Sequence, residues 1–524
     1  MRVASRGPGG LTIALSAWLS ISQSPAWALL EPFDVREASI DSIHMALFTG
    51  MATCRGIVSS FISRIEKFNP IINAIISLNA ESLSTADQID LQIAAGNKTG
   101  ALLCIPALRD AGSIILGKAN LHELALEGIS VSSFGGQTIK PYDLSRTPGG
   151  SSGGSGAVIA ANLAVFATGT DTVNSLRSPA SANSLFSFRP TRGLISRAGV
   201  IPVSHTQDAV GAMARNLKDL AVTLTVMSTI GYDPRDDATA DIPPGVQGKD
   251  YSASLHGASL KGLRLGLLDG FFNYNPSAET TPVNDAMNIM VSQLAVAGAV
   301  VVNITETTYN ALAIAAALDV QSYEYRELLN GYLAGPGADG SPRPTSFSEI
   351  YESGEFLVLP SQYEYVKSSA VSSTSNSSYF TTQRGIQNLT QALQTTFLAN
   401  NLDAIIYPEQ KNLAVKIGSP SQSGRNGILA ALTGYPVIVV PVGISPPSKD
   451  APIGVPMGME ILGRPWSEGL LLNIAKHISD LQPVRKMPPF ANQTVETKSY
   501  SAVPVVTPNT GNIPTAYPMG VLWR

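Results

Sequence analysis

The sequence carries little charge, few histidines and only two cysteines, and each shortage excludes a class of function. Charged residues are 14% of the chain and the formal net charge is −4, with no basic cluster that would bind nucleic acid. The five histidines do not cluster, so we expect no metal site and no cofactor; they are His44, His122, His205, His256 and His477. With 46 glycines and 35 prolines, the composition is typical of a compact, loop-rich enzyme rather than a disordered or coiled-coil protein.

Long apolar runs are also lacking, apart from one at the N-terminus. Arg2 and Arg6 precede the apolar run 11–21, and the small-x-small sequence 26–28 follows it. This arrangement predicts a signal peptide over 1–28, because the run is too short to span a membrane comfortably. An ordinary buried helix and an uncleaved anchor are the alternatives. We expect a secreted, extracellular protein with no stable membrane span.

Two further features bear on secretion. Five Asn-x-Ser/Thr sequons agree with it and predict a glycoprotein; their asparagines are Asn97, Asn303, Asn376, Asn388 and Asn492. Cys54 and Cys104 could form a disulfide in a secreted protein. They could equally remain two buried thiols, since a chain of 524 residues is large enough to fold without a disulfide. Both alternatives stay open.

A glycine- and serine-rich stretch, 147–157, is the most distinctive part of the chain. Such runs are usually flexible linkers. A linker should separate two self-contained segments, but here the apolar run 157–165 follows at once and is typical of a buried helix. A glycine-rich loop that leads into a buried helix presents backbone N–H groups and hydroxyls to a bound group.

Apolar periodicity predicts an α/β protein. Strands alternate with helices, which indicates a largely parallel sheet covered on both faces. The predicted strands are 113–116, 262–268, 299–304, 402–407, 436–440 and 457–462, and the predicted helices include 38–68, 80–95, 284–297 and one that begins at Asn120. The segment 495–524 is rich in Pro, Thr and Asn without periodicity, and predicts an irregular tail or a strap on the surface.

The stretches 147–157 and 169–181 together resemble the amidase signature family, serine hydrolases that cleave C–N bonds. The resemblance covers about 31–489, including 423–436 and 458–466 near the end. It implies a single large α/β/α sandwich with a mixed central sheet, and a small-molecule amide as substrate. Neither the particular amide nor the oligomeric state is indicated.

The resemblance also implies the site. Ser175 corresponds to the nucleophile, and Ser151 to the family's bridging serine, which follows a cis peptide bond. The implied oxyanion and substrate-binding residues are Gly149, Gly150, Ser152, Thr172, Val173 and Asn174. The family's base is a lysine kept neutral by burial, which receives the nucleophile's proton through the bridging serine.

The sequence departs from the family in two places. The family's Gly-Ile-Pro is soon followed by Lys-Asp-Asn, which carries the catalytic lysine, but here Ile105-Pro106 runs directly into Ala107–Gly112. Lys98 and Lys118 do not correspond to that lysine. The glycines usual before the nucleophile are replaced by Val173-Asn174, which predicts a distorted oxyanion loop. Two interpretations follow: an amidase acting through Ser175, or a catalytically impaired relative or incomplete gene model that retains only the scaffold.

Other catalytic patterns fit less well. Residues 150–154 match Gly-x-Ser-x-Gly, but 145–148 do not form the strand which that elbow requires. His122-Glu123 begins a zinc-protease pattern, yet Leu126 stands where the second histidine is needed. His205 is predicted to be a core or surface histidine, and Asp171 and Arg177 are predicted to be structural.

Overall fold

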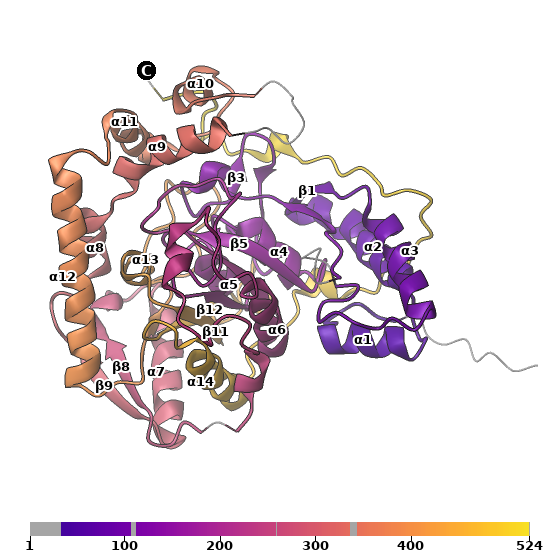
Figure 1. The fold of residues 1–524 in the computed structure, drawn as a ribbon, viewed down its shortest axis with the longest axis horizontal. Helices are drawn as coiled ribbons and strands as arrows, with labels where there is room; N and C mark the ends of the chain where they lie inside the picture. The colour runs from indigo at the N-terminus through magenta and orange to yellow at the C-terminus, as the bar shows by residue number, and fades with distance from the viewer. Residues whose placement is uncertain (1–32, 106–111, 258, 336–342, 523–524) are drawn as a thin grey trace, which may run out of the picture.

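The computed structural model describes residues 33–105, 112–257, 259–335 and 343–522, and its centre is an eight-stranded sheet (Figure 1). The strand order is β5-β7-β6-β11-β12-β10-β8-β9. These strands are β5 (Phe166–Asp171), β6 (Phe186–Arg189), β7 (Ala209–Ala214), β8 (Arg264–Leu268), β9 (Val300–Ile304), β10 (Ala404–Pro408), β11 (Val437–Ile444) and β12 (Pro456–Leu462). Two small sheets pair β1 (Ile75–Leu78) with β2 (Gly117–Ala119), and β3 (Val131–Ser132) with β4 (Gly136–Gln137).

The large sheet is mixed, as expected, but antiparallel pairs dominate it. Within the described residues, only the neighbours β10-β8 and β8-β9 run parallel, and the other five pairs are antiparallel. The expectation of a mostly parallel sheet is therefore wrong outside the β8–β10 region. Strand–helix alternation in sequence does not determine direction when, as between β11 and β12, the connection is a loop.

Helices cover both faces of the sheet and confirm the α/β sandwich. Alternate residues of β10 pack into different cores: Ile406 belongs to a cluster with α7 and α14, and Ile405 to one with α8, α12 and α13. The helices are α1 (Ile40–Phe48), α2 (Cys54–Ile72), α3 (Ser82–Ala94), α4 (Gly153–Ala160), α5 (Arg177–Ala182), α6 (Leu217–Met227), α7 (Thr281–Val296), α8 (Ala311–Leu318), α9 (Gln321–Leu333), α10 (Phe347–Glu352), α11 (Tyr363–Val371), α12 (Ser377–Ala399), α13 (Ile428–Thr433) and α14 (Glu468–Leu481).

The N-terminal part differs from its prediction in three ways. The expected helix 38–68 is two helices, because the chain breaks around Gly50 (φ 75°) and Thr53 caps α2 by accepting from the N–H of Gly56. The expected strand 113–116 is irregular, and the pairing strand is β2 instead. No α-helix begins at Asn120; a short 3-10 turn, η2 (Glu123–Ala125), follows it.

Cys54 and Cys104 form a disulfide, with 5.7 Å between their Cα atoms, so the two alternatives for the cysteines are resolved. The bond ties the start of α2 to the chain just before residue 106. Around that point the backbone pairs with itself: the N–H of Cys104 donates to the carbonyl of Gly112, and that of Ile114 to the carbonyl of Ile105. The residues on the two sides of 106–111 therefore lie next to each other.

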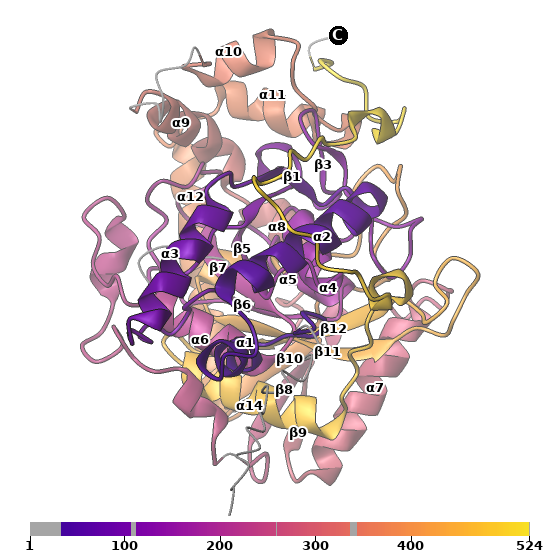
Figure 2. The same cartoon turned by 90° about the vertical axis from the view of Figure 1, so that its right-hand side faces the viewer.

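The C-terminal segment, which is drawn in yellow in Figure 2, runs over the N-terminal helices and ends beside α10. The N–H of Asn509 donates to Asn73 Oδ1, and Asn512 Oδ1 accepts from the N–H of Gln137. Leu357 and Met519 form an isolated β-bridge near its end. The segment is irregular but held to the surface by these bonds.

Some expectations fall outside the described residues. The signal peptide 1–28 and the junction between Pro106 and Ala107 are among them. Among the helices of the described ranges, none combines the length and the apolar character needed to span a membrane.

Candidate active site: two serines on adjoining loops

The glycine-rich stretch packs too closely for side chains. A Cβ on Gly150 would lie 2.7 Å from Ser130 Oγ, and one on Gly154 would lie 2.1 Å from the carbonyl oxygen of Asn120. Gly149 has φ +75°, and the peptide bond between Gly150 and Ser151 is cis. The segment is therefore a rigid, buried loop that enters α4, and the linker interpretation is wrong.

Ser130 holds this loop in shape. Its hydroxyl donates to the carbonyl of Gly149 at 2.7 Å and accepts from the N–H of Gly153 at 3.1 Å. The N–H of His122 donates to the carbonyl of Ser151 at 2.9 Å. Burial lowers the pKa of His122 to about 3, so its ring is neutral at physiological pH.

The structure places the two serine-bearing segments side by side. The N–H of Ser152 donates to the carbonyl of Ser175 at 3.2 Å. Ser152 Oγ also lies 3.3 Å from both the nitrogen and the carbonyl oxygen of Thr170 on β5. Ser151 is fully buried and Ser175 is 7% exposed. The residues expected from sequence to form one site, 149–152 and 172–175, thus occupy adjoining loops.

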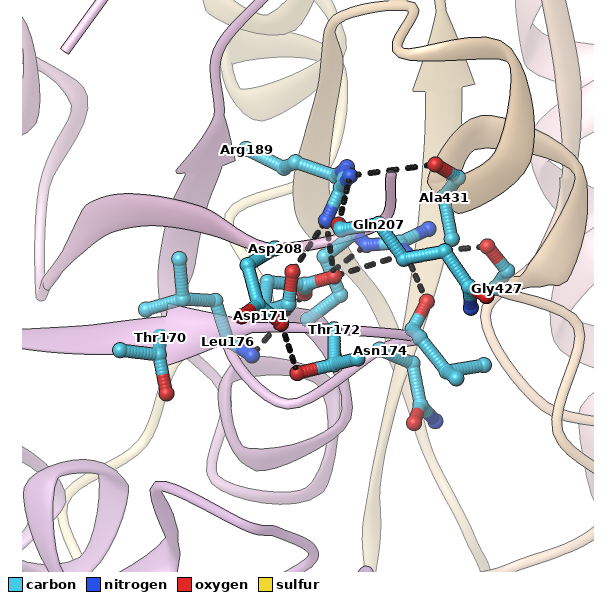
Figure 3. Close-up of polar contacts among 12 residues, drawn as sticks. Thr170, Asp171, Thr172, Asn174, Leu176, Arg189, Gln207, Asp208, Gly427 and Ala431 are labelled. Carbon is cyan, nitrogen blue, oxygen red and sulfur yellow. Dashed lines mark hydrogen bonds and ion pairs between the residues drawn. The ribbon is translucent and has the colours of Figure 1, made fainter. Parts of the chain in front are cut away.

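A buried ion network determines the shape of the loop that carries Ser175 (Figure 3). Asp171, at the end of β5, pairs with Arg177 at 3.1 Å and with Arg189 of β6 at 2.7 Å. Arg177 also pairs with Glu460 of β12 at 2.7 Å and donates to the carbonyls of Val173 and Gly427. Although burial raises the pKa of Asp171, Arg177 and Arg189 hold it at about 2.

The loop between Asp171 and Arg177 tolerates the residues that replace glycine. Neither Val173 nor Asn174 has a positive φ, so the expected distortion of the oxyanion loop does not follow from its backbone angles. Within the described residues, the N–H groups of Val173, Asn174 and Ser175 donate to no protein acceptor. Unbonded N–H groups beside a serine are what an oxyanion requires.

Sequence reasoning did not identify Glu409 and Gly427, which contact the loop 172–175. Glu409 Oε1 accepts from Asn174 Nδ2 at 3.1 Å, and burial raises the pKa of Glu409 to about 8, so it is largely protonated at neutral pH. A Cβ on Gly427 would lie 2.3 Å from the carbonyl oxygen of Val173. Neither residue is near Ser175 in sequence. Gly427 lies within 423–436, which resembles the family, but nothing in that stretch predicts its contact with Val173.

No base contacts the serines in the described part of the chain. Ser151 Oγ is buried without a hydrogen-bond partner there. Lys118 is exposed on β2. Lys140 is fully buried, its Nζ lacks a partner among the described residues, and burial lowers its pKa to about 7. Sequence reasoning did not single out Lys140, because nothing in 138–142 shows that the side chain points inward.

The remaining candidates are structural. His205 is about half exposed and pairs with Asp237 at 2.9 Å on the surface. Across the described ranges, no group of three or more His, Cys, Asp or Glu side chains is placed to hold a metal. Asp171 and Arg177 shape the loop, as the sequence predicted.

An α/β sandwich that presents a serine beside unbonded N–H groups, with a second serine buried next to it, is typical of serine-dependent acyl-transfer enzymes. Comparison with known proteins identifies the class more closely. The chain belongs to the amidase family: the family described as Amidase matches residues 104–472.

Individual relatives agree over most of the chain. The A subunit of glutamyl-tRNA(Gln) amidotransferase from Acinetobacter baumannii is 29% identical, covering 84% of this chain and 95% of the relative. Among solved structures, the native peptide amidase from Stenotrophomonas maltophilia is 30% identical with a TM-score of 0.75, covering 88% of this chain and 100% of that one. A bacterial aryl acylamidase, 19% identical with a TM-score of 0.70 and covering 85% and 96%, shares the fold.

Gly427→Ala tests the packing behind the nucleophile loop. The added methyl group would meet the backbone of Val173, and overpacking of this kind costs about 1–3 kcal/mol. We expect a clearly lower melting temperature and weaker labelling of Ser175 by a fluorophosphonate. Gly331→Ala is the matched control, since nothing lies within 4 Å of its added methyl. Equal behaviour of the two variants would contradict the packing argument.

Lys140→Met tests the cost of burying the lysine. The pKa of Lys140 falls from 10.5 in the unfolded chain to about 7 in the folded protein. Between these values the unfolded state binds more protons, so wild-type stability rises with pH. We expect Lys140→Met to stabilise the protein at pH 7, by on the order of a few kcal/mol, and to lose that advantage near pH 10.5.

Thermal unfolding from pH 6 to 10.5 measures this difference. The exposed Lys261 supplies the control Lys261→Met, which should change stability little at any pH. A Lys140→Met protein that is no more stable than wild type at pH 7, or whose gain in stability is independent of pH, would show that burial of Lys140 does not destabilise the folded protein.

Proposed function

We propose that this protein hydrolyses a carboxamide C–N bond through an acyl-enzyme on Ser175. The observation that carries the proposal is the adjoining position of Ser175, Ser151 and the unbonded N–H groups of the 173–175 loop. Membership of the amidase family supports it, as do the relatives named as a peptide amidase and an amidotransferase subunit.

The proposed reaction uses these groups. Ser175 Oγ attacks the carbonyl carbon and loses its proton, and Ser151 Oγ holds the position of the family's relay. The carbonyl oxygen becomes an oxyanion, which the N–H groups of Val173, Asn174 and Ser175 stabilise. The C–N bond then breaks as the nitrogen takes up a proton. Water hydrolyses the resulting ester, releasing the acid and restoring Ser175.

Among the described residues, no side chain is placed to accept the proton of Ser175 through Ser151. Ser151 Oγ meets no partner within the described residues, and the family's lysine segment is absent from the sequence. Because Ser151 Oγ is buried, water or hydroxide would accept the proton at Ser175, which is 7% exposed, so we expect slow turnover that rises with pH. The same observation favours the second candidate, a non-catalytic scaffold.

Labelling by a fluorophosphonate decides between the two candidates. We expect wild type to be labelled and Ser175→Ala to lose all labelling, because Ser175 Oγ is the proposed nucleophile. Ser361→Ala is the control, because Ser361 is exposed and bonds only the carbonyl of Pro420. Absence of labelling in wild type with a normal melting transition would favour the scaffold.

We further propose that the protein is a secreted glycoprotein whose first 28 residues are removed as a signal peptide. The asparagines of all five sequons are exposed, and the two cysteines are joined in a disulfide. Both features suit an oxidising, glycosylating compartment.

Expression in a eukaryotic host tests this proposal. We expect the protein in the medium, starting after residue 28, with a mass that falls when N-glycans are removed enzymatically. Replacing the five sequon asparagines by glutamine should abolish the change in mass. An intracellular protein of unchanged mass that retains residues 1–28 would contradict the proposal.

A further inference from the structure

A cavity of about 260 Å³ lies beside the loop that carries Ser175. Thr170 and Thr172 form one wall, the segment 198–203 forms another, and Leu328 and Tyr332 of α9 close it. Whole ligands usually occupy about 300–1,000 Å³, so this cavity suits one part of a substrate rather than all of it.

The cavity adjoins the end of β5 and the start of the loop that carries Ser175, although neither Ser151 nor Ser175 lines it. Thr170 lines it, and both backbone polar groups of Thr170 lie at 3.3 Å from Ser152 Oγ. The N–H of Ser152 in turn donates to the carbonyl of Ser175. Thr172, three residues before Ser175, lines the cavity, so a group bound there would lie beside the loop that carries Ser175. Figure 3 shows Thr170 on β5 and Thr172 directly after it, where the loop begins.

The buried charges of the cavity wall already have partners. Arg197 pairs with Asp236 at 2.6 Å and donates to the carbonyl of His205. Asp208 accepts from Thr172 Oγ1 at 2.6 Å and from the N–H groups of Val203 and Ser204. A charged ligand group would have to compete with these bonds.

The charged groups at the rim are paired as well. His205 contacts Asp237 at 2.9 Å, and Arg235 contacts Asp233 at 2.9 Å. The rest of the wall is largely apolar and includes Val200, Val203, Val210 and Leu328. A neutral, apolar group would lose no hydrogen bonds there and would gain from leaving water.

We propose that this cavity binds a neutral, apolar substituent of the amide substrate and makes the enzyme selective for it. The proposal rests on the proposed amidase function and adds the substrate class. Because Thr170 and Thr172 line the cavity, this selectivity would belong to the same site as Ser175.

Two series of neutral amides test the proposal on the full-length protein. One lengthens the acyl chain from propanamide to heptanamide, and the other lengthens the amine side from N-methyl- to N-pentylacetamide. In one of the series we expect kcat/KM to rise about fourfold for each methylene buried. If the rise occurs in the acyl series, 6-aminohexanamide should react at least about tenfold more slowly than heptanamide, because its ammonium would lose its water in the cavity.

Val200→Trp fills the cavity from its rim, where Val200 is only partly buried. We expect this variant to lose most of the gain with chain length, so that the ratio of kcat/KM for the longest and shortest amide falls. Val296→Trp is the matched control, since Val296 is 91% exposed on α7 and does not line the cavity. A ratio that is flat in both series, or unchanged in Val200→Trp, would overturn the proposal.

Binding measurements separate failure of the cavity from failure of the chemistry. If no amide is hydrolysed, calorimetry with heptanamide, propanamide, N-pentylacetamide and N-methylacetamide still tests the cavity in the same protein. Tighter binding of the longer amide in one pair, lost in Val200→Trp and kept in Val296→Trp, would support the cavity while the amidase proposal fails. Equal binding within both pairs would overturn it.

Discussion

The structure depends on a set of completely buried charges that links strands of the large sheet. Asp171, Arg177, Arg189 and Glu460 come from β5, α5, β6 and β12, and none of their side chains is exposed. Removing one partner of such a set leaves an uncompensated buried charge, which typically costs about 3–5 kcal/mol. Because Arg177 also binds the carbonyl of Val173, the same network that joins three strands gives the loop before Ser175 its shape.

The loop that carries Ser151 and Ser152 contains no buried charges, and its shape depends on glycines at positions that leave no room for side chains. Gly150, Gly153 and Gly154 lie where any Cβ would strike Ser130 or the backbone of Asn120. Only at Gly149, with φ +75°, does backbone conformation itself call for glycine. Close packing thus holds Ser151 and Ser152, whereas ionic bonds hold Ser175, and the hydrogen bond between Ser152 and Ser175 joins the two supports.

The site has the two loops but, among the described residues, lacks a proton acceptor. The nucleophile loop, the unbonded N–H groups and an apolar cavity are present, but no side chain among the described residues receives a proton from Ser151. On the two sides of residues 106–111, the N–H of Ile114 donates to the carbonyl of Ile105. The loops that hold Ser151 and Ser175 therefore keep their shape without a base that would make Ser175 a strong nucleophile.

The sequence by itself determined the fold class, the family and the two serine-bearing loops, because short patterns of glycine, serine and apolar residues reflect local packing. It also placed the late strands β8 to β12 within a few residues. Tertiary structure alone decided the antiparallel majority of the sheet, the disulfide, the support of Asn174 by Glu409 and the inward position of Lys140. These depend on contacts between residues distant in sequence, and neither propensity nor periodicity carries information about such contacts.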